Sequence, residues 1–191
     1  MYNKFSNGMI EVITGPMFSG KSEELLRRIR ILEYAKYEIL VIKPSFDTRF
    51  SVSKIVSRAG TEHNTFVLDD IKKVYELINK DTNAIVIDEA HFFGDDIVEV
   101  VNQLANEGFL VILSGLDQDF LRRPFYNMSQ ILSLAERVTK LQAVCVVCHN
   151  LASCSYRKSN DVDVLLLDDT SNYEARCRKC HNDGVKNKEK K

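Results

Sequence analysis

The sequence lacks three features that would tie the protein to a membrane or to nucleic acid. No apolar run approaches the roughly 18 residues that a membrane-spanning helix needs. The N-terminus has no charged-then-apolar segment of the kind that directs secretion. The formal net charge is only −1, from 26 basic and 27 acidic residues, so no overall field attracts polyanions. We therefore expect a cytoplasmic protein with no membrane partner and no nucleic-acid partner.

What the sequence does contain is an alternation of strand-like and helix-like segments. Residues 9–14, 38–43, 84–87 and 109–113 are short apolar or β-rich runs, the pattern of strands in a buried parallel sheet. Residues 22–36 instead carry leucine and isoleucine at helical spacing. Further helices are predicted at 71–78, 95–107 and 129–136, and a further strand at 138–144. Strands that alternate with helices predict an α/β fold with a parallel sheet.

A phosphate-binding loop joins the first predicted strand to the first predicted helix. The residues there match the P-loop pattern in full: Gly15, Pro16, Met17, Phe18, Ser19, Gly20, Lys21 and Ser22. Glycine permits a tight turn whose backbone N–H groups bind phosphate oxygens, and the helix N-terminus adds partial positive charge. Lys21 can reach the β- and γ-phosphates of ATP, and the Ser22 hydroxyl can ligate Mg²⁺. A chance glycine turn is the alternative, and the strand–loop–helix context argues against it.

Two acids end the buried run at 84–87. Asp88 is placed to hold Mg²⁺ opposite Ser22, and Glu89 is free to act as a base toward an alcohol. Two solvated acids at a strand end are the alternative interpretation. Asp88 to His91 also spells a DEAH helicase box, but a second RecA-like domain and a basic strand-binding groove do not fit into 191 near-neutral residues.

Four of the five cysteines form two C-x-x-C pairs, Cys145 with Cys148 and Cys177 with Cys180. Two thiolate pairs at this spacing suit a closed, tetrahedral Zn²⁺ site with a structural role. His149 or His181 could replace a neighbouring thiolate, and a C-x-x-C redox motif is the weaker alternative.

The change of composition at the first cysteine pair predicts three regions. A nucleotide-binding α/β domain covers residues 1–143, and a small zinc-binding domain covers 144–182, with one strand-like run at 162–167. The lysine-rich remainder, 183–191, is expected to be a disordered basic tail.

With these motifs in order, the chain resembles the cytosolic-type (type II) thymidine kinases along nearly its whole length. The family's own form of the P-loop is followed by Asp47-Thr-Arg49, Asp88-Glu-Ala-His-Phe-Phe93, Leu116-Asp-Gln-Asp-Phe120 with Arg123-Pro-Phe125, and the paired cysteines. The resemblance implies a RecA-like P-loop sheet flanked by helices plus a small zinc-binding lasso domain. It also implies transfer of the γ-phosphate of ATP to the 5′-hydroxyl of thymidine.

The resemblance implies roles for individual residues. Glu89 resembles the family's catalytic base, and Arg49 is similar to an arginine that faces the transferring phosphate. The implied nucleotide contacts outside the P-loop are Asp47, Asp88, Glu89, Ala90 and His91. The implied nucleoside contacts are Met17, Leu116, Phe120, Phe125 and the lasso residues Val164, Leu165, Leu166, Leu167, Asp168 and Tyr173. His91 is a departure, because the family usually has glutamine there.

The resemblance further implies a homotetramer and feedback inhibition by dTTP. Two other classes of function stay open on the residues alone. A P-loop regulatory ATPase would hydrolyse ATP without a nucleoside, and a zinc-ribbon protein could bind nucleic acid through Arg176, Arg178, Lys179 and the lysine tail. Dependence of ATP consumption on thymidine would separate the three.

Overall fold

The computed structural model describes residues 8–45, 54–56, 62–159 and 172–189. Five predicted site residues in the lasso, 164–168, lie outside these ranges, as do Asp47 and Arg49. The strand-like run at 162–167 likewise falls outside the described residues.

A six-stranded sheet forms the centre of the molecule, and every pair of neighbouring strands in it is parallel. The order is β5-β2-β6-β7-β1-β8. The strands are β1 (Met9–Thr14), β2 (Glu38–Pro44), β5 (Phe66–Leu68), β6 (Thr82–Ile87), β7 (Leu110–Gly115) and β8 (Arg137–Lys140). The predicted α/β class is therefore confirmed. Because all strands run the same way, their carboxyl ends meet at one edge, where ligands bind in open parallel sheets.

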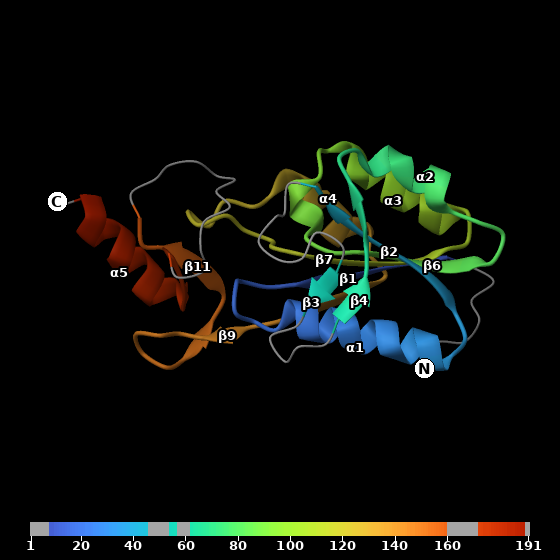
Figure 1. The fold of residues 1–191 in the computed structure, drawn as a ribbon. Helices are drawn as coiled ribbons and strands as arrows, with labels where there is room; N and C mark the ends of the chain where they lie inside the picture. The colour runs from blue at the N-terminus through green and yellow to red at the C-terminus, as the bar shows by residue number, and fades with distance from the viewer. Residues whose placement is uncertain (1–7, 46–53, 57–61, 160–171, 190–191) are drawn as a thin grey trace.

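Helices cover both faces of this sheet (Figure 1). One face is covered by α1 (Lys21–Tyr34), and the other by α2 (Val74–Leu77), α3 (Asp96–Asn106) and α4 (Tyr126–Leu134). Short 3-10 turns precede α2, at η1 (Ile71–Lys73), and follow β6, at η2 (Ala90–Phe92). A small hairpin, β3 (Lys54–Val56) with β4 (Glu62–Asn64), lies beside the sheet. The described part of the chain contains no helix with both the length and the apolar content to cross a bilayer.

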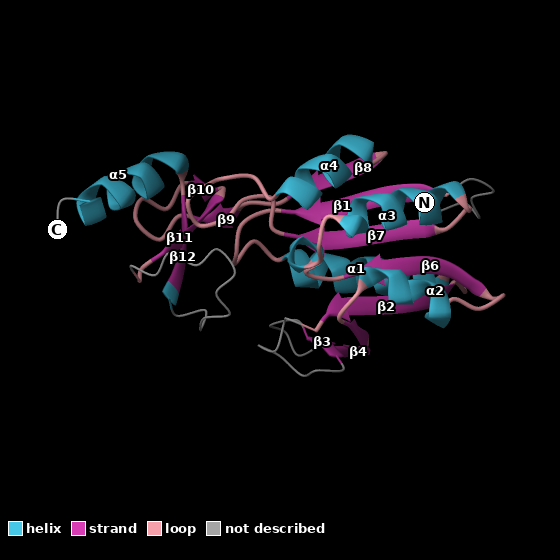
Figure 2. Cartoon of the chain, turned by 90° about the horizontal axis from the view of Figure 1, so that it is seen from above, coloured by secondary structure: helices cyan, strands magenta, loops and turns pink. Residues whose placement is uncertain are grey.

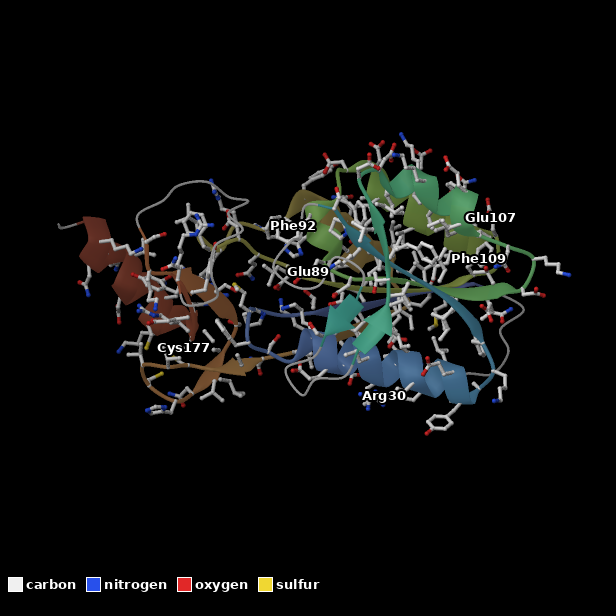
Figure 3. All side chains as sticks on the ribbon, in the orientation of Figure 1. Arg30, Glu89, Phe92, Glu107, Phe109 and Cys177 are labelled. Atoms are coloured by element: carbon white, nitrogen blue, oxygen red, sulfur yellow. The ribbon has the colours of Figure 1, made fainter. Side chains whose placement is uncertain are left out.

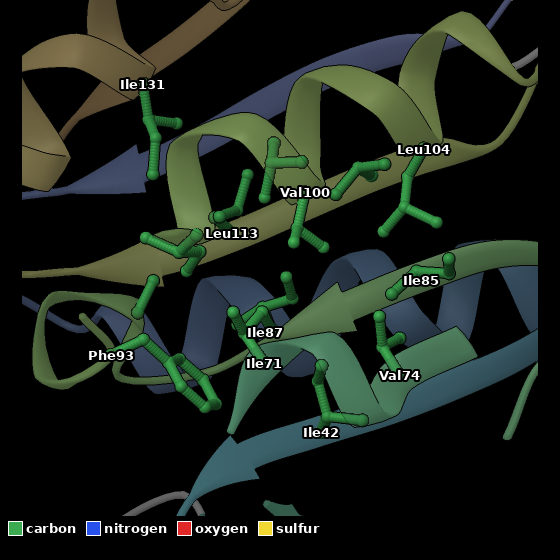
Figure 4. Packing of buried hydrophobic residues seen from close by; sticks show 14 of the residues in the cluster. Ile42, Ile71, Val74, Ile85, Ile87, Phe93, Val100, Leu104, Leu113 and Ile131 are labelled. Atoms are coloured by element: carbon green, nitrogen blue, oxygen red, sulfur yellow. The ribbon is translucent and has the colours of Figure 1, made fainter. Parts of the chain in front are cut away.

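Aliphatic side chains fill the space between the sheet and its helices. Figure 4 shows Val100 and Leu104 of α3 pointing toward Ile85 and Ile87 of β6, in a cluster whose buried members are almost all aliphatic. A second cluster on the opposite face packs Leu25, Leu26, Ile29 and Leu32 of α1 against the same sheet. Strands that are apolar on both sides therefore bury both faces, as expected of a parallel sheet.

The chain beyond β8 builds a separate small unit next to the carboxyl edge of the sheet (Figure 2). It contains β9 (Ala143–Val144), β10 (Leu151–Ala152), β11 (Cys154–Arg157), β12 (Tyr173–Arg176) and α5 (Arg178–Glu189). The predicted strand at 138–144 is in fact two strands, because β8 ends at Lys140 beside β1 and β9 pairs with β10 in the small unit.

The expectation of a disordered tail from residue 183 is wrong, since α5 continues to Glu189. The helix carries almost no aliphatic residues, so its sequence has no apolar stripe to reveal it. It is attached through polar contacts instead. The Nζ of Lys188 donates to the carbonyl oxygens of Arg157 (2.7 Å) and Ser159 (2.6 Å).

Candidate active site

The phosphate loop lies between β1 and α1, at the carboxyl edge of the sheet. Gly15 has a φ of 146°, and a Cβ there would come within 2.5 Å of the Leu141 carbonyl oxygen. Gly20 has a φ of 83° and caps the N-terminus of α1. Both positions therefore need glycine for conformational reasons. The helix N-terminus that follows is a site where backbone N–H groups and the helix dipole favour an anion.

Two side chains of the loop converge on one carbonyl group. The Nζ of Lys21 donates to the carbonyl oxygen of Pro16 (2.9 Å), and the hydroxyl of Ser19 donates to the same atom (2.8 Å). The lysine ammonium is thus held over the loop, within the concave backbone. A phosphate bound there would meet a positive charge already in position.

The paired acids follow β6 at the same edge of the sheet. Asp88 is buried, and one of its carboxylate oxygens accepts from the backbone N–H of Glu89 (3.0 Å). Glu89 has a φ of 49°, in the left-handed region, which costs of order 1–3 kcal/mol and persists only where the surroundings fix it. Figure 3 shows Glu89 at the side of the sheet that faces the small unit, far from Glu107 at the opposite edge.

His91 is buried next to Glu89. Its Nδ1 accepts from the backbone N–H of Leu116 (3.2 Å) and is 3.5 Å from a Glu89 carboxylate oxygen. The ring also packs against Phe92 and Phe125. The carbonyl oxygen of a glutamine could accept the same N–H, so the departure from the family pattern keeps an acceptor at this point.

An aromatic pocket adjoins the phosphate loop. It brings together every predicted nucleoside contact that the structure describes: Met17, Leu116, Phe120, Phe125 and Tyr173. Its volume is about 30 Å³, far below the ~300 Å³ of a typical small ligand pocket. A nucleoside would therefore enter only if the lining moves outward.

Five further residues line this pocket and were not predicted from the sequence: Phe92, Gln118, Asp119, Ser155 and Arg157. The hydroxyl of Ser155 accepts from the backbone N–H of Met17 (2.9 Å), which ties the small unit to the phosphate loop. A lone serine in a short strand gives no sequence signal of such a contact. Asp119 holds the loop after β7 by accepting from the backbone N–H groups of Leu121 and Arg123 (both 2.8 Å).

The four paired cysteines form one cluster in the small unit. Their sulfur atoms all lie within 4.8 Å of one another, and the sulfurs of Cys148 and Cys177 are 3.6 Å apart. Four thiolates around a tetrahedral zinc would be separated by ~3.8 Å, from a Zn–S distance of ~2.3 Å. The donor set therefore fits a metal ion. Within the described ranges neither His149 nor His181 joins the cluster, and His181 Nε2 instead lies 2.8 Å from the Phe120 carbonyl oxygen.

Hydrogen bonds within the cluster shift the pKa values of its thiols in opposite directions. Burial raises the pKa of Cys145, but hydrogen bonds from the backbones of Cys177, Cys148 and Val147 outweigh it and bring that pKa down to about 6. A hydrogen bond to the sulfur of Cys177 favours the protonated thiol of Cys180 and raises its pKa to about 12.

A P-loop after the first strand, paired acids after β6 and an adjoining aromatic-lined pocket define a P-loop nucleotide-binding protein. The model of the thymidine kinase family matches residues 8–181. The chain belongs to the thymidine kinase family.

Individual relatives agree with the family match over the full length. The chain is 60% identical to a thymidine kinase of Metamycoplasma arthritidis over 189 residues, covering 98% of this chain and 97% of the relative. It is 50% identical to a thymidine kinase of Mycoplasma mobile, covering 98% and 94% of the two chains. The identity to a thymidine kinase of Mycoplasma mycoides is 44%, with 94% and 91% covered.

Proposed function

We propose that this protein transfers the γ-phosphoryl group of ATP to the 5′-hydroxyl of deoxythymidine, giving dTMP and ADP. The observation that carries the proposal is the position of Met17, which belongs to the phosphate loop and also lines the aromatic pocket. An acceptor bound in that pocket would lie directly beside a bound triphosphate. Proximity of this kind can supply much of the rate enhancement of phosphoryl transfer.

Glu89 is the proposed base. Its carboxylate takes the proton of the 5′-hydroxyl as the new bond forms between the 5′-oxygen and the γ-phosphorus. The bond from the γ-phosphorus to the bridging oxygen breaks, and ADP leaves. Lys21 stabilises the charge on the β- and γ-phosphates, and Arg49 is proposed to face the transferring phosphate.

Ser22 and Asp88 offer the hydroxyl and carboxylate oxygens that Mg²⁺ prefers, so they are the proposed ligands. When bound, this ion neutralises charge on the β- and γ-phosphates. Zn²⁺ is proposed for Cys145, Cys148, Cys177 and Cys180, where it would supply a structural cross-link. The chain's own part is to hold the four sulfur donors close together and to bury Asp88.

The proposed nucleoside site combines the aromatic pocket with the lasso residues 164–168, whose backbone would pair with the edge of the thymine base. A thymine presents two carbonyl groups and one N–H, which backbone groups can complement. Two regions, 1–143 and 144–182, remain the proposed domain division. A homotetramer and inhibition by dTTP remain predictions from the resemblance. The free cysteines suit the reducing cytoplasm, which is the proposed location.

The test is the formation of ADP by metal-replete protein, with and without single nucleosides. We expect turnover that depends on thymidine, with weaker turnover on other pyrimidine deoxynucleosides and none on purines. Turnover without any nucleoside would favour the regulatory ATPase. Salt-sensitive binding of RNA or DNA in the absence of turnover would favour the nucleic-acid binder. Either result would contradict the proposal.

A further inference from the structure

Arg157 is an arginine with a buried side chain at the end of β11. Its exposed fraction is 2%, and it is among the largest fully buried side chains in the described residues. It lies opposite Tyr173 in the antiparallel pair of β11 with β12. Directly opposite residues in such a pair project from the same face of the sheet. Burying a guanidinium is costly unless it is hydrogen-bonded, so its contacts indicate what it does.

The guanidinium of Arg157 joins two aromatic walls of the pocket. Its Nε and Nη2 donate to the hydroxyl oxygen of Tyr173, at 2.9 and 2.6 Å. Its central carbon lies 3.8 Å from the centroid of the Phe120 ring. Tyr173 belongs to the small unit, whereas Phe120 belongs to the loop after β7 of the central sheet. One side chain therefore fixes the separation of two aromatic residues that come from different parts of the molecule.

Helix α5 supports this arrangement from behind. The Nζ of Lys188 donates to the carbonyl oxygens of Arg157 and Ser159, at the end of β11 and just after it. The same helix reaches the loop that carries Phe120, because His181 Nε2 lies 2.8 Å from the Phe120 carbonyl oxygen. Arg122 also donates to the side-chain oxygen of Asn182 on α5 (2.9 Å). The helix thus braces both sides of the contact made by Arg157.

We propose that Arg157 is a positioning residue for the nucleoside, which sets the distance between Phe120 and Tyr173, and that Lys188 of α5 supports it. The inference rests on the proposed function, because it assigns the pocket to a nucleoside. Arg157 acts through the two aromatic rings rather than on the phosphate. Its loss should therefore weaken nucleoside binding and leave the phosphate loop intact.

The main variant is Arg157→Met, which keeps an apolar stem of similar length and removes the hydrogen bonds and the stacked charge. We expect the KM for thymidine to rise by about 10- to 100-fold, the usual consequence of losing a hydrogen bond to a charged group. The KM for ATP should stay within about 2-fold, since Lys21 and the loop glycines are untouched. Arg157→Lys keeps the charge but lacks the planar guanidinium, so its thymidine KM should lie between those of the wild type and of Arg157→Met.

A double-mutant cycle separates positioning from a general structural role. Tyr173→Phe removes the hydroxyl that accepts from Arg157. If the two residues act together, the fold-rise in thymidine KM of the double variant should be well below the product of the fold-rises of the two single variants. Lys188→Gln should raise the thymidine KM by about 3- to 10-fold. Lys186→Gln, an exposed position two residues earlier on α5, is the matched control and should leave it unchanged.

A folded Arg157→Met variant with an unchanged KM for thymidine would overturn the inference, as would equal rises in the KM values for thymidine and ATP. Should Arg157→Met fail to fold, Tyr173→Phe and Lys188→Gln decide, and an unchanged thymidine KM in both overturns it. A wild-type protein that phosphorylates no nucleoside would instead remove the proposed function. The two failures can be told apart, because the activity of the wild-type protein is measured before any variant is compared with it.

Discussion

The central α/β region and the small cysteine-containing unit are stabilised in different ways. The central sheet is packed on both faces with buried valine, leucine and isoleucine. Among the residues that the structure describes, the small unit's core cluster is Ala143, Cys145, Ala152 and Ala175, with the other paired cysteines and Phe18 of the phosphate loop packed against it. So little apolar area cannot order a unit of this size alone, and such units generally depend on a bound metal or another cross-link.

The difference matters because the candidate site draws on both regions. The phosphate loop and the paired acids belong to the central region, which supports itself. The aromatic pocket needs Tyr173, Ser155 and Arg157 from the small unit. Phosphate binding should therefore survive damage to the small unit, whereas nucleoside binding should not.

The largest effect is expected from disrupting the cysteine cluster. Cys177→Ser, or removal of the metal by a chelator, should reduce thymidine-dependent turnover by more than ~100-fold, because the metal supplies most of the folding free energy of such a unit. ATP binding, measured with a fluorescent nucleotide, should change little. Cys154→Ser is the control, since Cys154 lies outside the cluster. Joint loss of nucleotide and nucleoside binding would show that the two regions are not independent.

Glu89→Gln tests the chemistry of the central region. Removing a positioned base should lower kcat by about 10²–10⁴-fold. The KM values for ATP and thymidine should remain close to those of the wild type, since the side chain keeps its size. Steady-state kinetics with both substrates varied measure the effect. Near-normal kcat would exclude Glu89 as the base.

Leu104→Ala tests the hydrophobic core of the central region. Leu104 is fully buried between α3 and the sheet, so the substitution should lower the free energy of unfolding by ~2–5 kcal/mol. Denaturant unfolding followed by circular dichroism measures this loss. The metal content of the small unit should not change. A variant that loses metal but keeps its free energy of unfolding would contradict the view that this core stabilises the central region and not the small unit.

Ser155→Ala tests the contact between the two regions. It removes the acceptor for the Met17 N–H and should cost ~1–2 kcal/mol in transition-state binding, or about 5- to 30-fold in kcat/KM for thymidine. Ser153→Ala is the matched control two residues earlier. Equal kinetics in the two variants would mean that the contact with the phosphate loop has no functional role.

The smallest effect is expected at Glu24 on α1, away from the small unit. Hydrogen bonds from Arg27 lower the pKa of its carboxyl to about 2 from 4.5. A depressed pKa stabilises the fold above the unfolded-state value, and this contribution disappears as pH falls from 4.5 toward 2. The Arg27 partner is exposed, so solvent screens the pair, and Glu24→Gln should cost only ~0.3–1 kcal/mol at pH 7 and progressively less below pH 4.5. Unfolding curves at pH 7, 4 and 3 check this trend, and a cost that grows on acidification would contradict it.

The central region could be predicted well because its signals are local. Apolar runs and a complete P-loop predicted the main strands and α1 to within a few residues. The edge strand β5 was not predicted, since three residues with an exposed Phe66 carry too little pattern.

In the small unit, only the cluster of paired cysteines could be predicted from the sequence. The helix α5 is held by Lys188 and His181 through backbone carbonyl groups, contacts that leave no periodic pattern in the sequence. Arg157 reads as an ordinary strand residue until its pairing with Tyr173 is known. Long-range polar contacts of this kind depend on the tertiary arrangement, which composition and spacing do not encode.

The claim that a phosphate loop and an adjoining nucleoside pocket act together is tested most directly by following the label of γ-labelled ATP. Metal-replete protein should transfer the label to the 5′-position of thymidine in a one-to-one ratio with ADP formed. Release of the label as inorganic phosphate, with none on thymidine or any other nucleoside, would contradict it.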